Sequence, residues 1–278
     1  MKFTLLPLGL IISVILVFKT DVLSKQDDFQ GEAIYMYKSS LELGSFGANM
    51  SEAQKNQIKE RLKNRLEKTF TLVFNREESF YKENERLDAV SGATDSWGNN
   101  FAAGDQYKNV KTNTQIQEQE FYGKRFLVKD ELQPIKWTMA SETKKIGNYM
   151  CFKAVALIPT NDLTWYSFSW DKLRPASNEQ TQNSDSVEEE MALTKVEAWY
   201  TPQIPVSHGP SEFWGLPGLI LEINSGNITM LCSKLTLNPQ EKLTIKIPQK
   251  GEQVTKKEYQ DIILTKMMEF RDNRIGRR

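Results

Sequence analysis

The sequence is poor in the residues that metal and redox sites need. It has one histidine, His208, and two cysteines, Cys151 and Cys232, which lie far apart and form no Cys-x-x-Cys pair. A zinc site takes three or four ligands from histidine, cysteine and carboxylates, so the sequence predicts neither a metal site nor a cofactor. It also lacks a P-loop and a Gly-x-Gly-x-x-Gly motif, the glycine-rich patterns that hold nucleotide phosphates.

The chain also lacks an excess of charge of either sign. Lysine plus arginine and aspartate plus glutamate each number 36 in 278 residues. Nucleic-acid-binding domains usually carry a basic surface that neutralises phosphates. The composition therefore gives no reason to expect nucleic acid as a partner.

Long hydrophobic runs are scarce as well, and the longest, at residues 5–18, follows Lys2. A bilayer span needs about 20 apolar residues, whereas a secretory signal combines a basic residue with a shorter apolar segment. The sequence therefore predicts a signal peptide at residues 1–24 and an exported mature chain, residues 25–278, without a transmembrane span. An uncleaved membrane anchor is the alternative.

Alternation of apolar and polar residues with a period of two dominates the mature chain, as in half-buried strands. Short polar links separate most of the runs, and parallel strands would need crossovers of about a dozen residues. We therefore expect a mainly β (α+β) fold in a single domain, residues 25–278. Its architecture is expected to be one curved antiparallel sheet or half-barrel of roughly eight to ten strands with two packed helices. The expected strands lie in residues 33–39, 70–74, 148–157, 163–170, 195–200, 219–223, 228–237 and 243–247.

Two helices interrupt the strands. Ser51 with Gln54, and Thr255 with Glu258, form capping-box sequences, in which two side chains satisfy the first N–H groups of a helix. Apolar residues then recur at helical spacing, which predicts that one stripe of each helix packs on the sheet. These residues are Ile58, Leu62 and Leu66 in the first helix and Tyr259, Ile263, Met267 and Phe270 in the second.

Two segments are expected to be long loops. Residues 88–106 are rich in glycine, alanine and asparagine and carry Trp97 and Phe101, so this loop should fold onto the body or close over a ligand. Residues 174–190 are polar and end in consecutive glutamates, which predicts a mobile acidic loop within the domain. There, Asp185-Ser186-Val187 fits a short O-glycosylation pattern of envelope bacteria, with Ser186 as the modified residue.

Two glycine–proline corners stand close together in HGPSEFWGLPGLILEI, residues 208–223. In the LPGL stretch at residues 216–219, proline fixes φ near −65° and Gly218 supplies the positive φ that a type II turn requires. Pro210 is typical of the first residue of a helical turn, which we expect at residues 211–214. The segment is thus expected to be a two-cornered connection between two strands.

The same stretch, extended to WYTPQIPVSHGPSEFWGLPGLILEI, resembles the signature of the GLPGLI family, which is named after the residues found here at 215–220. The stretches FTLVFNREESFYKE, GKRFLVKDEL and KWTMASETKKIGNYMCFKAVAL also resemble that family, so the likeness covers most of residues 30–250. It implies an exported protein of a Gram-negative cell envelope, periplasmic or in the outer envelope, with no assigned activity. His208 departs from the acidic or small residue that the family has there. The signature residues are Pro205, Gly209, Pro210, Gly215, Leu216, Pro217 and Gly218.

The two cysteines of an exported chain are candidates for a disulfide between Cys151 and Cys232, provided that they lie on neighbouring strands. Two free buried thiols are the alternative. His208 is expected to be a loop histidine with satisfied hydrogen bonds. A hydrolase that uses a cysteine, His208 or carboxylates is the competing functional class, although neither a nucleophile-elbow motif nor a cysteine-protease motif surrounds these residues.

Aromatic residues flank the bend, and a curved antiparallel sheet can present such residues on a concave face that binds apolar or peptide-like ligands. We therefore expect a non-catalytic cell-envelope protein that binds a small ligand or a protein partner. The 88–106 loop and the bend would form the rim of its site. The candidate binding residues are Trp97, Phe101, Trp199, Phe213 and Trp214.

Overall fold

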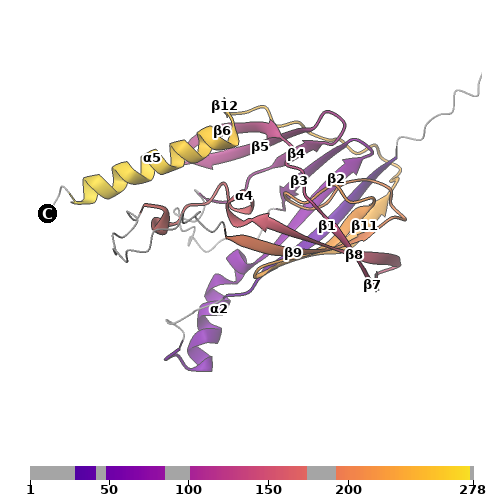
Figure 1. The fold of residues 1–278 in the computed structure, drawn as a ribbon, viewed down its shortest axis with the longest axis horizontal. Coiled ribbons are helices and arrows are strands. Elements are labelled where there is room, and N and C mark those ends of the chain that lie inside the picture. Colours follow the sequence, from indigo (N-terminus) through magenta and orange to yellow (C-terminus); the bar gives the residue numbers. More distant parts are fainter. Residues whose placement is uncertain (1–28, 42–47, 85–100, 174–191, 276–278) are drawn as a thin grey trace, which may run out of the picture.

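The computed structural model describes residues 29–41, 48–84, 101–173 and 192–275. Over these ranges the protein is mainly β, with one sheet of twelve strands, three α-helices and a 3₁₀ turn (Figure 1). The prediction of a mainly β fold built on one sheet is confirmed. The predicted signal peptide, the acidic loop with Ser186, and most of the 88–106 loop, including Trp97, lie outside the described residues. Within the described ranges, every helix is too short or too polar to cross a membrane.

The sheet keeps most sequence neighbours side by side. Its order is β12-β6-β5-β4-β3-β2-β1-β11-β10-β9-β8-β7. Every neighbouring pair is antiparallel except β12 with β6, so the sheet is mixed rather than purely antiparallel. The strands are β1 (Gln30–Ser39), β2 (Glu67–Asn75), β3 (Glu78–Glu83), β4 (Gln106–Asn109), β5 (Thr114–Phe121), β6 (Lys124–Glu131), β7 (Thr138–Ile146), β8 (Tyr149–Pro159), β9 (Leu193–Thr201), β10 (Leu219–Ser225), β11 (Ile228–Leu237) and β12 (Glu252–Val254).

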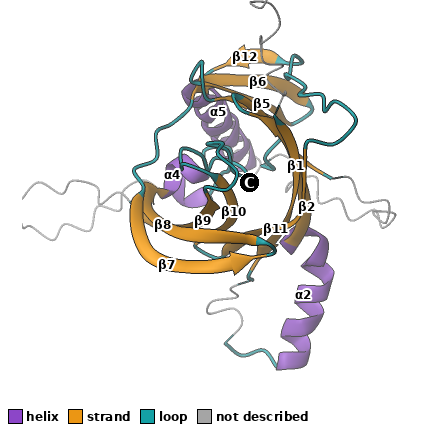
Figure 2. Ribbon diagram, turned by 90° about the vertical axis from the view of Figure 1, so that its right-hand side faces the viewer, coloured by secondary structure: helices purple, strands orange, loops and turns teal. Residues whose placement is uncertain are grey.

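Three clusters of buried side chains hold the sheet and its connections together. The first lies on β8, β9 and β10 and includes Phe213 and Leu216 from the bend. The second includes Tyr35 of β1 and Leu72 of β2. The third joins β6 to the last helix around Tyr259. Figure 2 shows the strands turning around a central region that holds a short helix, α4, and several loops.

The C-terminal helix α5 (Lys256–Ile275) behaves largely as predicted. Thr255 and Glu258 form the expected capping box, since the Glu258 carboxylate accepts from the Thr255 N–H at 2.7 Å and the Thr255 hydroxyl accepts from the Glu258 N–H at 3.2 Å. Tyr259, Ile263 and Met267 are buried against β6 and its neighbours. Phe270, expected on the same stripe, is exposed instead.

The helix α2 (Glu52–Leu66) contradicts the prediction of two packed helices. Its capping box at Ser51 and Gln54 is present, but none of its residues is buried. In Figure 1 it extends away from the sheet. Single apolar residues at intervals of four on a charged helix make a stripe too narrow to cover a sheet face.

Two predicted strands are absent. Residues 163–170 span the end of α4 (Thr160–Leu163), a turn and the start of the 3₁₀ turn η1 (Trp170–Leu173). Here Trp165 is buried against Tyr259 of α5, with ring centres 5.8 Å apart, which draws the chain out of the sheet. Residues 243–247 pair with no strand of the described chain, because they belong to the connection that leads from β11 to β12 at the edge of the sheet.

The connection from β9 to β10 contains the predicted corners, but their geometry differs. Positive φ occurs at Gly215 (90°) and at Ser211 (49°) rather than at Gly218, so neither the type II turn nor the helical turn after Pro210 forms as expected. Gly218 is needed for space instead, since a Cβ there would lie 2.2 Å from the Thr201 carbonyl oxygen. The chain therefore changes direction here by packing its backbone closely against Thr201, and not through the two predicted turn types.

Gly218→Ala should destabilise the fold by about 3 kcal/mol, because a fixed backbone carbonyl cannot yield to the added methyl group. Urea denaturation measures the loss. Gly226→Ala is the matched control: its φ is 56°, but nothing lies within 4 Å of the Cβ position, so only the strain of about 1 kcal/mol should appear. Equal losses in the two variants would contradict the close-contact explanation.

Candidate functional site

Lys108 is the centre of a polar cluster inside the fold. It lies on β4 directly opposite Gln115 of β5, so both side chains occupy the same face of the sheet, and both are buried. The ammonium group of Lys108 donates to the carbonyl oxygens of Gly209, Ser211 and Phe213 at 2.9, 2.6 and 3.3 Å. One lysine thus fastens the first half of the bend to the sheet.

Glu212 is the acceptor at the centre of the same cluster. Its carboxylate accepts from Gln106 at 3.0 Å, from Gln115 at 3.0 and 3.1 Å, from the indole N–H of Trp165 at 3.1 Å and from the ammonium group of Lys256 at 3.3 Å. The side chains of Glu212 and Lys256 are only 12% and 14% exposed. A carboxylate this far from water is tolerated only when it is both paired and hydrogen-bonded, and Glu212 meets both conditions.

The sheet face under the bend is polar because glutamines point inward. Gln115, Gln117 and Gln119 alternate along β5 and are at most 3% exposed, while Ile116 between them is less buried. Sequence reasoning missed this cluster, because a strand with glutamine inside inverts the usual apolar-inside pattern. The available signal was the Gln-x-Gln-x-Gln spacing itself.

Burial is the main cause that lowers the pKa of Lys108 to about 7; Glu212 raises this pKa and Lys256 lowers it. The three carbonyl oxygens engage the three protons of the ammonium form, which holds the charge in place. Lys108 is buried, and every proton of its ammonium form is engaged by a carbonyl oxygen, so it presents no free proton to a substrate. Its geometry is that of a residue that holds the bend.

His208 is fully buried beside this cluster, and in the described chain neither ring nitrogen has a hydrogen bond of ordinary geometry. The prediction of a satisfied loop histidine is therefore wrong. Burial, and then the charge of Lys108, lower the pKa of His208 to about 3, while the backbone of Asn75 acts in the opposite direction. The imidazole is thus neutral near pH 7, and its ring lies 6.3 Å from that of Phe74.

Cys151 and Cys232 are free thiols, so the expected disulfide is not formed in the structure. They lie on β8 and β11, with β9 and β10 between them in the sheet, whereas the prediction required neighbouring strands. Burial raises the pKa of the two thiols to about 11 and about 12. This shift is opposite to the one that activates a cysteine nucleophile.

The predicted binding aromatics do not come together. Phe213 is buried in the first core cluster, and Trp214 beside it donates its indole N–H to the Gln133 carbonyl at 2.9 Å. Phe101 packs on the third cluster and Trp199 on the second. These four residues therefore contribute to packing in three different places.

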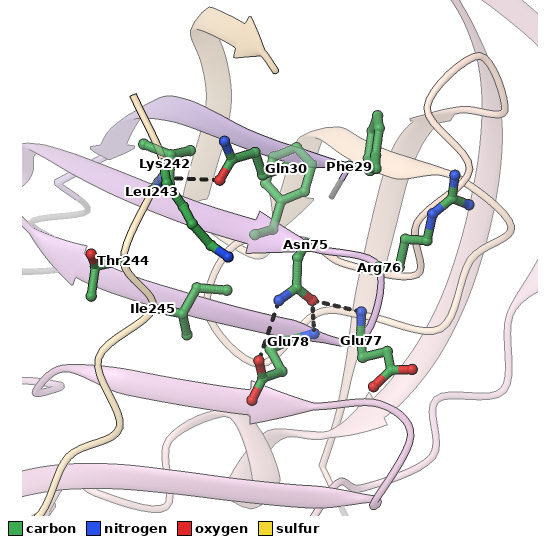
Figure 3. A pocket seen from close by; sticks show the side chains of 11 residues that line it. Phe29, Gln30, Asn75, Arg76, Glu77, Glu78, Lys242, Leu243, Thr244 and Ile245 are labelled. Atoms are coloured by element: carbon green, nitrogen blue, oxygen red, sulfur yellow. Dashed lines mark hydrogen bonds between the residues drawn. The ribbon is translucent and has the colours of Figure 1, made fainter. Parts of the chain in front are cut away.

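A cavity of about 680 Å³ opens where β1 begins and where β2 turns into β3 (Figure 3). Phe29 supplies aromatic surface, with the buried Phe74 ring behind it, and Leu243 and Ile245 supply aliphatic surface. Asn75 fixes the turn, since its side-chain oxygen accepts from the N–H groups of Glu77 and Glu78 at 2.8 and 2.7 Å. The polar lining consists of Gln30, Asn75, Arg76, Glu77, Glu78, Lys242 and Thr244.

A second cavity, of about 380 Å³, lies at the start of α5 and is lined in part by Trp165 and Lys256. Both residues bind Glu212, so this cavity opens onto the polar cluster. Carboxylates of Asp130, Glu131 and Asp162 also line it. The described residues nonetheless contain no group of three or more histidine, cysteine or carboxylate side chains arranged to hold a metal ion.

The chain matches one family model and is distantly similar to solved structures. A model of a family described as a protein of unknown function, Porph_ging, matches residues 137–222, which run from β7 to β10 and include the whole bend. No curated protein matches the sequence. The chain is similar to two structures of PNGF-II, in space groups C2 and P21, with 15% and 16% identity and TM-scores of 0.47 and 0.45. These matches cover 85% and 84% of this chain but only 33% of each PNGF-II chain, so this chain spans about a third of their length.

Lys108→Met should destabilise the protein by about 3–5 kcal/mol, because it strips the donor from buried carbonyls and leaves Glu212 with less positive charge nearby. Denaturant titration measures the change. Lys111→Met is the control, since that lysine is 67% exposed and pairs only with Glu77 at the surface; it should change stability by less than about 0.5 kcal/mol. A Lys108→Met protein as stable as the wild type would refute the role assigned to the ammonium group.

The stability that His208 contributes should depend on pH between 6.5, its ordinary pKa, and about 3, its pKa in the fold. Because the folded state resists protonation, this stability is complete above pH 6.5 and is lost as the pH falls towards 3. The loss is on the order of 5 kcal/mol, at about 1.4 kcal/mol per pKa unit. Unfolding free energies measured across this range should fall less steeply in His208→Asn than in the wild type. If the unfolding free energies of the two proteins fell equally with pH, the His208 ring would not be buried as a neutral group.

Proposed function

We propose that this chain is a binding protein of the cell envelope that takes an amphipathic ligand into the cavity at the β2–β3 turn. The observation that carries the proposal is the cavity itself. At about 680 Å³ it falls within the roughly 300–1,000 Å³ range of small-molecule sites, and apolar residues line it together with polar and charged ones.

The lining favours a ligand with an apolar part and a charged or hydrogen-bonding part. Phe29 and Phe74 lie 6.3 Å apart, centre to centre, and form a tilted aromatic pair. The guanidinium group of Arg76 lies 5.4 Å from the centre of the Phe29 ring. In Figure 3, Lys242 points across the cavity from the opposite wall. An apolar or peptide-like molecule with a charged or hydrogen-bonding group fits these surfaces.

The location in the envelope is part of the proposal. It is supported by the apolar run at residues 5–18 after Lys2 and by the GLPGLI-like stretch at residues 205–220. Membership of the GLPGLI family and a periplasmic or outer-envelope location are part of the proposal on the same grounds. The half-barrel description of the sheet is also part of it, and the curvature of the strands in Figure 2 supports it. We do not propose a hydrolase, because the thiols are buried in their neutral form and His208 is sealed off from solvent.

The proposal predicts that 8-anilinonaphthalene-1-sulfonate, an aromatic anion, binds the folded protein with saturable fluorescence enhancement. Ile245→Asp should weaken this binding by about tenfold, because it places a carboxylate on the aliphatic wall of the cavity and repels the sulfonate. Ile247→Asp introduces the same charge on the same segment. Ile247 is 46% exposed and does not line the cavity, so this control should bind as the wild type does. Equal effects in both variants, or no saturable binding to the wild type, would refute the proposed site.

A further inference from the structure

The second cavity, at the start of α5, is walled mainly by polar side chains. Seven of its ten lining residues carry a charge or an amide group, and its volume is about 380 Å³. This volume lies within the range of small-molecule sites, but most such sites are apolar with only a few polar groups. A cavity of the opposite composition suits a ligand that itself has many hydrogen-bonding groups.

The buried part of the fold holds the walls of this cavity from behind. Trp165 donates its indole N–H to Glu212 at 3.1 Å. The Lys256 ammonium group donates to Glu212 at 3.3 Å and to the buried Gln115 at 3.2 Å. Asp130, near the end of β6, accepts from the backbone N–H of Lys256 at 3.1 Å. Because these side chains are fixed before a ligand arrives, binding costs less conformational entropy.

Several hydrogen-bonding groups of the walls remain available to a ligand. The ammonium group of Lys256 has three protons, and the described structure supplies acceptors for two of them. Among the described residues, Asp162 accepts only one hydrogen bond, from Gln133 at 3.5 Å, and the Gln260 side chain makes none. The cavity thus offers donors and acceptors side by side, which matches a hydroxyl group because it can both donate and accept.

Charges of both signs line the cavity. The lining contains three carboxylates and two ammonium groups, those of Asp130, Glu131, Asp162, Lys256 and Lys257. A ligand with a strong charge of one sign would therefore meet repulsion as well as attraction, and a neutral ligand avoids this cost. An amino acid carries both charges but has few other hydrogen-bonding groups, so it would leave much of the polar wall unpaired.

From the polar walls, their available donors and acceptors and this mixture of charges, we propose that the second cavity binds a neutral sugar. Hydroxyl groups of the sugar donate to the Asp162 carboxylate and the Gln260 amide oxygen, and another accepts from the third proton of Lys256. Hydrogen bonds to charged partners are the stronger ones, so Asp162 and Lys256 supply most of the polar affinity. The site is separate from the cavity at the β2–β3 turn, and the inference therefore goes beyond the proposed function.

The test is a titration of the full mature chain with glucose, N-acetylglucosamine, maltose and cellobiose, followed by saturation-transfer-difference NMR. At least one of these sugars should give a saturable signal, whereas free lysine and glutamate should give none. Binding of the sugar should change little as sodium chloride rises from about 0.05 to about 0.5 M, because salt screens charged ligands and not neutral ones.

Variants locate the contact. Asp162→Ala should weaken binding of the sugar by at least about tenfold, because it removes a charged acceptor from the wall. Asp261→Ala is the matched control, since Asp261 is exposed on α5 and lies outside the lining, and it should leave the affinity unchanged. Gln260→Leu, at the neighbouring position, should weaken binding by about fivefold. Circular dichroism verifies that each variant is folded.

Each other outcome overturns the inference. If none of the four sugars binds, the second cavity is not a sugar site, and if lysine or glutamate binds instead, its ligand is charged. If Asp162→Ala and Asp261→Ala bind the sugar equally well, the sugar occupies a different place. Failure of 8-anilinonaphthalene-1-sulfonate to bind would overturn only the proposed function, because the dye and the sugars probe different cavities.

Discussion

The rest of the structure depends on the hydrogen bonds that the ammonium group of Lys108 donates to the bend. The connection between β9 and β10 is irregular, and the carbonyl oxygens of Gly209, Ser211 and Phe213 converge on one point inside the fold. Left without donors, buried carbonyls cost more than most single contacts contribute. A single lysine from β4 satisfies all of them, and in doing so it fixes where the bend lies on the sheet.

Burying that charge constrains its surroundings. Glu212 must stay close, and its carboxylate in turn gathers Gln115, Trp165 and Lys256. Lys256 begins α5, and its backbone N–H donates to Asp130 of β6 at 3.1 Å, so the same network positions the helix against the sheet. A further cation beside Lys108 and Lys256 would add repulsion without a partner; burial, and then the charge of Lys108, accordingly lower the pKa of His208.

The sequence predicted those parts of the fold whose pattern is local and conventional. β1, β2 and β8 to β11 alternate with apolar residues inside, and their positions follow from that pattern. β5 was missed because its buried residues are glutamines, and β7 because it is an edge strand whose residues are all at least partly exposed. Residues 243–247 show the opposite failure: apolar and polar residues alternate in their sequence, but within the described residues no strand pairs with them.

The candidate site was beyond sequence reasoning for a different reason. Its walls come from residues 29–30, 74–78 and 242–245, which only the tertiary fold brings together. The two thiols illustrate the same point: β9 and β10 separate Cys151 from Cys232 in the sheet, yet Cys151 belongs to the second core cluster and Cys232 packs against it, which neither strand alone reveals. By contrast, Phe213 and Trp214 were predicted to bind a ligand because large aromatic residues are easy to recognise in a sequence. In the structure Phe213 packs in the first core cluster, and Trp214 donates a hydrogen bond to Gln133.

The bend and the cavity are nevertheless connected through one line of contacts. Lys108 fixes the bend, the bend carries His208, and the His208 ring lies 6.3 Å from Phe74, which in turn lies 6.3 Å from Phe29 in the cavity wall. Phe74 is fully buried in the second core cluster, which also contains Ile204 and Val206 of the connection between β9 and β10. A bend held by backbone contacts and one buried lysine can therefore support the proposed binding cavity, although Phe213 and Trp214 are not among the residues that line it.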